Sequence, residues 1–348
     1  MAASARMLSQ DYGIIGRCMV RYRAQIISSL LWFLLLSASQ GIHARDIESV
    51  VFATNWYAQA EHGGFYQALA EGIYQRYGLD VEIRMGGPQV NGMQLLAAGK
   101  VDFLMGVPMT TVHAVAEGIP VVAVAATFQK DPAVVIAHSG IKSLAEIGNK
   151  QLDFYMSPSA NTSYFPWLKA EFGFTDTMVK PYNFSVTPFL LNQNAAQQGL
   201  VTSEPFAIEK AGIEPAVFLM ADFGYPPYAE TIETSRRMVE ENPDIVQRFV
   251  EASMKGWVSY LKNPMPGNSL IKKDNPEMTD EQLAYGIDTL KQYGIVTGGD
   301  ARGRGPGTMT DERWDELYQF MDKSGLLTKT LDISDVYTLD FVSRAEQD

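Results

Sequence analysis

The residues that follow the apolar stretch 49–53 have side chains suited to holding a small molecule. Asn55, Trp56 and Tyr57 come first, and His62 then precedes Gly63 and Gly64. An amide and an imidazole can orient a ligand, aromatic rings supply flat contact area, and glycines let the backbone approach closely. These residues therefore predict one part of a ligand pocket.

Similar residues follow other apolar runs. An acidic, an aromatic and several amide or hydroxyl residues complete the set, which is Gln89, Asn91, Ser157, Ser159, Asn161, Thr162, Ser163, Ser203, Glu204 and Phe206. Residues 159–163 also resemble the beginning of a helix, where free N–H groups can meet a ligand oxygen. This composition favours a small-molecule pocket built from several loops.

Three of these residues have alternative roles. His62 either hydrogen-bonds a ligand or holds the glycine turn through the backbone, and Trp56 either contacts a ligand or belongs to the core. Glu204, just before a proline, either binds a ligand or is an acidic residue at a helix start that faces water.

Catalytic and metal-binding patterns are absent from the sequence. After residue 44 the histidines are His62, His113 and His138, and no two of them have the spacing of zinc ligands. There is no G-x-S-x-G motif, no dinucleotide fingerprint and no Walker loop. We therefore expect a protein without enzymatic activity, metal or cofactor.

The elements that would position the pocket alternate between strands and helices. Short apolar runs near residues 49–54, 79–86, 101–107 and 119–128 alternate with helical patterns at 64–78, 90–100 and 110–118, and a second unit follows. Such alternation predicts an α/β fold with a parallel sheet, whose ligands lie beyond the carboxyl ends of the strands. The pocket residues named above fall at those ends.

The remainder of the chain after about residue 224 has mainly helical patterns. One helix is expected to begin at Asn242-Pro243. Two further helices are expected over residues 279–294 and 310–325. On the first of the three helices one face is apolar, and its residues are Val246, Phe249, Val250, Ser253, Trp257, Tyr260 and Leu261. We expect this face to be core.

The first 44 residues have the pattern of a secretory signal peptide. Arg17, Arg21 and Arg23 precede a short apolar run, and Ala44 stands at a plausible cleavage position. The alternative is an uncleaved membrane anchor. Cys18, the single cysteine, precedes the apolar run and would be removed with the signal, which leaves no disulfide or thiol chemistry.

The charge of the chain excludes one class of partner. The net charge is −12, and four of the basic residues lie within the first 44 positions. An acidic surface of this kind repels nucleic acid. We therefore expect no binding to nucleic acid, and the export pattern of the first 44 residues predicts a periplasmic location.

One segment resembles a known family. The stretch "TNWYAQAEHGGFYQALAEGIYQRYGLDVEI" is similar to the opening of periplasmic substrate-binding proteins of ABC importers, in the family related to thiamine-pyrimidine synthases. "GGPQVNGMQLLAAGKVDFLMG" and "TSEPFAIEKAG" resemble its later blocks, so that the resemblance covers most of residues 48–262. The sequence lacks the cysteine-rich motif of the pyrimidine synthases, so we do not expect it to carry out their chemistry.

The resemblance implies a two-lobe periplasmic binding protein fold of type II, with mixed sheets flanked by helices, a hinge and a ligand cleft between the lobes. The first lobe would hold residues 45–130 and 221–348, and the second would hold 131–220. Asn55 and Trp56 match the family's pocket-lining Asn-Trp, and Glu204 matches an acidic position that some relatives use on a ring amino group. The partners implied are an ABC permease and ATPase in the inner membrane, and the protein is expected to be a monomer.

The expected ligand is a small heteroaromatic ring, specifically a thiamine-precursor pyrimidine. The pocket segments contain no Arg or Lys, and a carboxylate beside a dianionic ligand would be costly. Stacking on Trp56 or Tyr57 and an amine on Glu204 fit such a ring. A sulfonate or other small organic ligand, a periplasmic sensor subunit and a pyrimidine-synthesis enzyme remain as alternatives.

Overall fold

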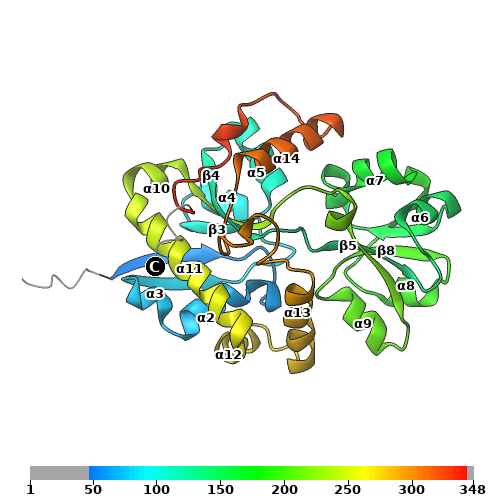
Figure 1. The fold of residues 1–348 in the computed structure, drawn as a ribbon, viewed down its shortest axis with the longest axis horizontal. Helices are drawn as coiled ribbons and strands as arrows, with labels where there is room; N and C mark the ends of the chain where they lie inside the picture. The colour runs from blue at the N-terminus through cyan, green and yellow to red at the C-terminus, as the bar shows by residue number, and fades with distance from the viewer. Residues whose placement is uncertain (1–46, 343–348) are drawn as a thin grey trace, which may run out of the picture. The chain divides into compact units, whose positions relative to one another are not determined.

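The computed structural model describes residues 47–342 as an α/β structure with two five-stranded sheets (Figure 1). Residues 47–342 belong to one compact unit. The predicted signal peptide, with Cys18 and Ala44, lies outside the described residues. Within residues 47–342 no helix is both long enough and apolar enough to cross a membrane.

The first sheet has the strand order β2-β1-β3-β10-β4. Its strands are β1 (Glu48–Ala53), β2 (Leu79–Arg84), β3 (Phe103–Gly106), β4 (Val121–Phe128) and β10 (Ala229–Ser235). β1 pairs in parallel with β2 and β3, as the alternation of strands and helices predicted. β10 pairs antiparallel with β3 and with β4.

The second sheet has the strand order β7-β6-β8-β5-β9. Its strands are β5 (Ala133–His138), β6 (Asp153–Met156), β7 (Val179–Pro181), β8 (Ala195–Leu200) and β9 (Pro215–Leu219). β6 is parallel to β7 and β8, whereas β5 is antiparallel to β8 and β9. The mixed sheets that the family resemblance implied are therefore confirmed, and the parallel arrangement predicted from the alternation of strands and helices holds for part of each sheet, because β10 and β5 run against their neighbours.

The chain passes from the first sheet to the second between β4 and β5, and it returns between β9 and β10. Two short connections of this kind are what a hinge between lobes requires. The division into lobes at residues 130/131 and 220/221 stays a prediction, since residues 47–342 belong to one compact unit.

Helices flank the strands of both sheets (Figure 1). Around the first sheet they are η1 (Ala60–His62), α2 (Gly63–Ala70), α3 (Ile73–Arg76), α4 (Gly92–Ala97), α5 (Pro108–Ala116), α10 (Arg236–Glu241), α11 (Pro243–Lys262) and α12 (Met265–Asp274). The single helix expected over 64–78 is in fact two, since Gly72 adopts a left-handed φ of 66° between α2 and α3. Glycine tolerates that conformation without steric cost.

The second sheet is flanked by α6 (Leu144–Lys150), η2 (Pro158–Thr162), α7 (Phe165–Phe172), η3 (Asp176–Met178), α8 (Thr187–Leu191), α9 (Glu204–Lys210) and η4 (Met220–Phe223). Residues 159–163 were expected to begin a helix. Residues 159–162 instead belong to the short 3-10 helix η2, and α7 begins only at Phe165, with Pro166 as its second residue. The remaining elements are α13 (Asp280–Gln292), η5 (Gly299–Ala301), α14 (Asp311–Lys323) and η6 (Ile333–Asp335).

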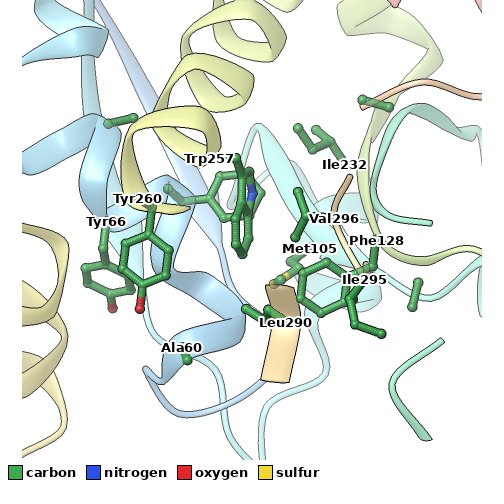
Figure 2. Close-up of a cluster of buried hydrophobic side chains, with 14 of the residues drawn as sticks. Ala60, Tyr66, Met105, Phe128, Ile232, Trp257, Tyr260, Leu290, Ile295 and Val296 are labelled. Carbon is green, nitrogen blue, oxygen red and sulfur yellow. The ribbon is translucent and has the colours of Figure 1, made fainter. Parts of the chain in front are cut away.

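The apolar face of α11 is buried, as its periodicity predicted. Trp257 and Tyr260 are both fully buried and lie close to Tyr66 and Phe128 (Figure 2). Gly63 and Gly64 permit this packing, because a Cβ on either residue would come within 2.2 Å of the ring of Tyr260 or Trp257. These two glycines therefore serve the core, and not the close approach to a ligand for which they were considered.

The strand β10 was not predicted from the sequence, whose pattern after residue 224 is mainly helical. It lies between β3 and β4 in the first sheet. Glu230 and Glu233, its two glutamates, are both buried. This strand supplies acidic side chains that the sequence-based pocket did not contain.

Candidate ligand-binding site

A cavity of about 550 Å³ is lined by residues that come from both sheets and their connecting loops. Seven residues predicted from the sequence line it, namely Asn55, Trp56, His62, Ser157, Ser159, Ser203 and Glu204. Ligand pockets of small-molecule binders have volumes of roughly this size. We refer to this space as the main cavity.

Three side chains on the first-sheet side form a hydrogen-bonded chain. The backbone N–H of Gln59 donates to His62 Nδ1 at 3.2 Å, so that the ring proton belongs on Nε2. His62 Nε2 then donates to Asn55 Oδ1 at 3.2 Å, and Asn55 Nδ2 donates to Glu230 Oε2 at 2.7 Å. The chain fixes the orientation of the Asn55 amide and of the Glu230 carboxyl.

His62 is neutral in this arrangement. The side chain is buried, and burial lowers the pKa of His62 to about 3. Both ring nitrogens have protein partners, one of them in the backbone of its own turn. The hydrogen bond from the Gln59 N–H fits the role in which His62 holds the turn through the backbone. The ring also lines the main cavity.

Glu230 has an unusual conformation and environment. Its φ of 50° lies in the left-handed region, which costs a non-glycine residue about 1 kcal/mol or more. Burial raises the pKa of Glu230 well above its ordinary value, and the nearby carboxyls of Glu61 and Asp131 raise it further. Backbone strain of this kind is concentrated at functional sites.

Glu61 and Asp131 bring two more carboxyls to the main cavity. Thr202 donates its hydroxyl hydrogen to Glu61 Oε1, and burial raises the pKa of Glu61 to about 7. Desolvation also raises the pKa of Asp131 to about 6, against one hydrogen bond of 2.8 Å from the Ala133 N–H.

Glu204 is better supplied with donors. Tyr182 Oη donates to Oε1 at 2.9 Å, and the Leu200 N–H donates to Oε2 at 2.7 Å. The Ser203 hydroxyl also donates to Oε2, at 2.5 Å. The side chain is half-buried at the main cavity, and its carboxylate is held by these three bonds.

The four carboxyls of the main cavity have no cationic neighbour in its wall. Among the described residues that line the cavity, none is Lys or Arg. Lys130, next to Asp131 in the chain, is paired instead with Asp222 at 2.7 Å. Within residues 47–342 no group of three or more His, Cys, Asp or Glu is arranged to hold a metal ion. The wall therefore contains carboxyls without a cationic partner among its described residues, and burial raises the pKa of three of them.

Aromatic rings from both sides meet at the main cavity. Trp56 lies 5.2 Å from Phe184, centroid to centroid, and Phe184 lies 5.4 Å from Tyr182. Phe184 remains 56% exposed and has a left-handed φ of 61°. A large side chain that is both exposed and strained suggests that its position serves a ligand.

Other predicted residues lie elsewhere. Tyr57 is 44% exposed and packs on the edge of Trp56 without lining the main cavity. Gln89 and Asn91 line a neighbouring cavity, where Asn91 also caps α4. Asn161 and Thr162 are exposed, and they donate to the carbonyls of Pro158 and Ser159 within η2.

Several lining residues were missed from the sequence. They are Gln59, Glu61, Asp131, Tyr164, Tyr182, Phe184, Gln198 and Glu230. The β-branched residues Thr231, Ile232 and Thr234 favour a strand at this point, but no alternation of apolar and polar residues accompanies them. No local pattern marks Glu61 or Asp131 as buried.

The fold is that of two-lobe periplasmic binding proteins. The structure superposes with a TM-score of 0.62 on a periplasmic sulfonate-binding protein SsuA from Methylobacillus flagellatus, described as part of a putative sulfonate ABC transporter. That match has 16% sequence identity and covers 87% of this chain and 94% of the other. At this level of identity the likeness concerns the fold.

The chain belongs to the NMT1/THI5-like family, whose model matches residues 59–266. It is 23% identical over 316 residues to a riboflavin-binding protein, RibY, of Chloroflexus aurantiacus, covering 85% of this chain and 86% of that protein. It is also 23% identical over 332 residues to a formylaminopyrimidine-binding protein of Halalkalibacterium halodurans, covering 90% and 98%.

Proposed function

We propose that this protein is the exported solute-binding component of an ABC-type importer and that it captures an amino-bearing heteroaromatic ring, an aminopyrimidine of the thiamine-precursor type. The family and the names of its relatives support a binding role. The choice of ligand rests on the main cavity itself.

One observation supports the ligand class above all others. Glu61, Asp131, Glu204 and Glu230 face one cavity whose described wall has no Lys or Arg. Burial raises the pKa of Glu61, Asp131 and Glu230, so an anionic sulfonate would favour their protonated form still further and would find no cationic partner in the described wall. Ring amines and protonated ring nitrogens are donors, and they would satisfy these carboxyls.

The two kinds of carboxyl suggest different roles. Glu204 already accepts three hydrogen bonds, whereas the described partner of the Glu230 carboxyl is the Asn55 amide. Acceptors that lack donors gain most from a ligand. We therefore assign the ring amine chiefly to Glu230, with Glu61 beside it. Glu204, to which the sequence had assigned this amine, then has a supporting role.

The flat face of the ring is assigned to the aromatic side chains. Trp56 and Phe184 come from opposite sides of the main cavity and are in contact with each other. Offset stacking on such rings adds to the gain from burying the ligand's apolar surface. A ligand that touches both sides has more contacts in the closed state than in the open state. This difference in affinity is what allows a ligand to favour hinge closure.

Delivery is proposed to follow closure. A permease and ATPase in the inner membrane would recognise the closed, monomeric protein and receive the solute, and no chemical change of the solute is required. The relatives named for binding support this non-enzymatic role.

Native mass spectrometry of the exported chain purified from a periplasm tests the proposal. Release and fragmentation of a bound aminopyrimidine or related amino-heteroaromatic is the expected result. A bound sulfonate would overturn the ligand class, and catalytic turnover of a candidate ligand would overturn the binding role.

A further inference from the structure

A second cavity of about 480 Å³ lies next to the main cavity, and Asn55 and Val107 line both. Its other walls come from the loop before α4, the start of α4 and the end of β3. Among the described residues that line it, Glu233 is the one charged side chain.

Glu233 is fully buried, and one of its oxygens has no partner. Thr111 and Thr231 donate their hydroxyl hydrogens to Oε1, the second at 3.1 Å. Oε2 has no hydrogen-bond partner among residues 47–342. An unsatisfied buried acceptor costs about 1–3 kcal/mol, so natural structures usually supply a partner.

The chain makes specific room for this carboxyl. A Cβ at Gly106 would lie 1.9 Å from the carboxyl carbon of Glu233, so that position 106 tolerates only glycine while the carboxyl stays there. Gly106 also lines the second cavity. The carboxyl therefore occupies a space that the neighbouring strand leaves open, at the side of the cavity.

We propose that the second cavity is a subsite for an arm of the ligand that ends in a hydrogen-bond donor, an ammonium or a hydroxyl group, which binds Glu233 Oε2. This inference rests on the proposed function, because the main cavity holds the ring from which the arm extends. The ligand is then a two-part molecule whose ring and arm are separated by Asn55.

The surroundings of Glu233 suit such an arm. Gln89 and Asn91, both exposed, and Thr110 add amide and hydroxyl groups at the rim. Burial raises the pKa of Glu233 to about 7, against the hydrogen bonds from Thr111 and Thr231. An ammonium arm favours the ionised carboxyl, so its binding at neutral pH releases a proton.

The test uses the full chain and 4-amino-2-methylpyrimidines titrated by calorimetry. One probe is the bare ring, and three others have arms of equal length at C5 that end in methyl, hydroxyl or ammonium. We expect the ammonium arm to bind about tenfold more tightly than the methyl arm, with proton release seen as a buffer-dependent enthalpy. A comparable gain with the hydroxyl arm supports the subsite and identifies an alcohol as the donor.

Glu233→Gln examines the residue directly. Glutamine can still accept from Thr111 and Thr231, but its amide nitrogen would oppose an ammonium, so the preference for the ammonium arm should vanish while affinity for the bare ring is unchanged. Glu82→Gln, the same change at an exposed position outside both cavities, should leave all affinities unaltered. Gln89→Trp, which fills the rim, should weaken every armed probe and spare the bare ring.

The outcomes separate the two proposals. If the bare ring binds but donor-ended arms add nothing, or if their advantage survives Glu233→Gln, the subsite is wrong and the proposed function stands. If neither the bare ring nor any armed probe binds, the proposed ligand class fails and the subsite falls with it.

Discussion

The two sides of the main cavity differ in how their carboxyls are satisfied. On the first-sheet side, Glu61 and Glu230 are buried, and each accepts one hydrogen bond from a described side chain. On the second-sheet side, Glu204 is half-buried and accepts three. Glu61 and Glu230 are therefore desolvated and have few hydrogen-bond donors. Glu204 is held in place by three hydrogen bonds from the protein.

This difference explains how one cavity can both select and position a ligand. Desolvation destabilises the charged form of Glu61 and Glu230, and a ligand that offers hydrogen-bond donors to them offsets that penalty. Glu204 gains less from the ligand, because its hydrogen bonds are already made. Specificity for donors should therefore come mainly from the first-sheet side.

The largest expected effect concerns the stability of the unliganded protein. Burial raises the pKa of Glu61 from an ordinary value of 4.5 to about 7, so the folded state binds a proton more tightly than the unfolded state. This stabilisation is fully present below about pH 4.5 and is lost as the pH rises through 7. We expect Glu61 to contribute about 3 kcal/mol at most to the fall in unfolding free energy over this range.

Urea unfolding of the wild type and of Glu61→Gln between pH 5 and pH 8 measures that contribution. The variant should lose less stability than the wild type as the pH rises. Identical pH profiles for the two proteins would mean that Glu61 ionises normally and that the first-sheet side is not desolvated.

The second prediction compares Glu230→Gln with Glu204→Gln. Glu230→Gln removes a carboxyl that can ionise when it accepts a hydrogen bond from the ring amine, and it should lower the affinity for an aminopyrimidine about 100-fold, since a hydrogen bond to a charged group contributes up to about 3 kcal/mol. The change at residue 204 should cost less than tenfold. Calorimetric titration of both variants gives the order, and an equal or reversed order would refute the proposed division of roles.

Trp56→Ala should lower the affinity between about 10- and 100-fold, because the ring loses its stacking partner. Tyr57→Ala is the matched control, since Tyr57 is a neighbouring aromatic that does not line the main cavity. Its effect should be small in the same titration. Loss of affinity in the control alone would place the stacking surface at Tyr57.

The smallest effect is expected at Phe184. Replacement by Ala or Gly removes the ring and should weaken binding severalfold in either variant. Glycine relieves the left-handed strain at φ 61°, so Phe184→Gly should unfold about 1 kcal/mol less readily than Phe184→Ala. Thermal unfolding compares them, and equal stabilities would show that the backbone relaxes once the ring is gone.

The sequence was most informative where local pattern and tertiary environment agree. The structure confirms the α11 stripe, the first three strands and the start of α11 at Pro243, although the Asn242 side chain makes no capping hydrogen bond. Asn55, Trp56, His62, Ser159 and Glu204 are at the main cavity, because strand ends converge at one edge of a sheet.

The acidic character of the site could not be predicted in the same way. Glutamate is almost never fully buried, so Glu230 and Glu233 argued against a strand at residues 229–235 when only local sequence was considered. Their burial is a consequence of β10 entering between β3 and β4, which depends on residues more than 100 positions earlier. The position of Phe184 opposite Trp56 likewise follows from long-range packing.

A paired titration of the full chain tests the central claim most directly. The protein would be titrated at neutral pH with 4-amino-5-hydroxymethyl-2-methylpyrimidine and, separately, with ethanesulfonate. The acidic main cavity predicts saturable binding of the pyrimidine, weakened by Glu230→Gln, and no binding of the sulfonate. Binding of ethanesulfonate without binding of the pyrimidine would contradict the account.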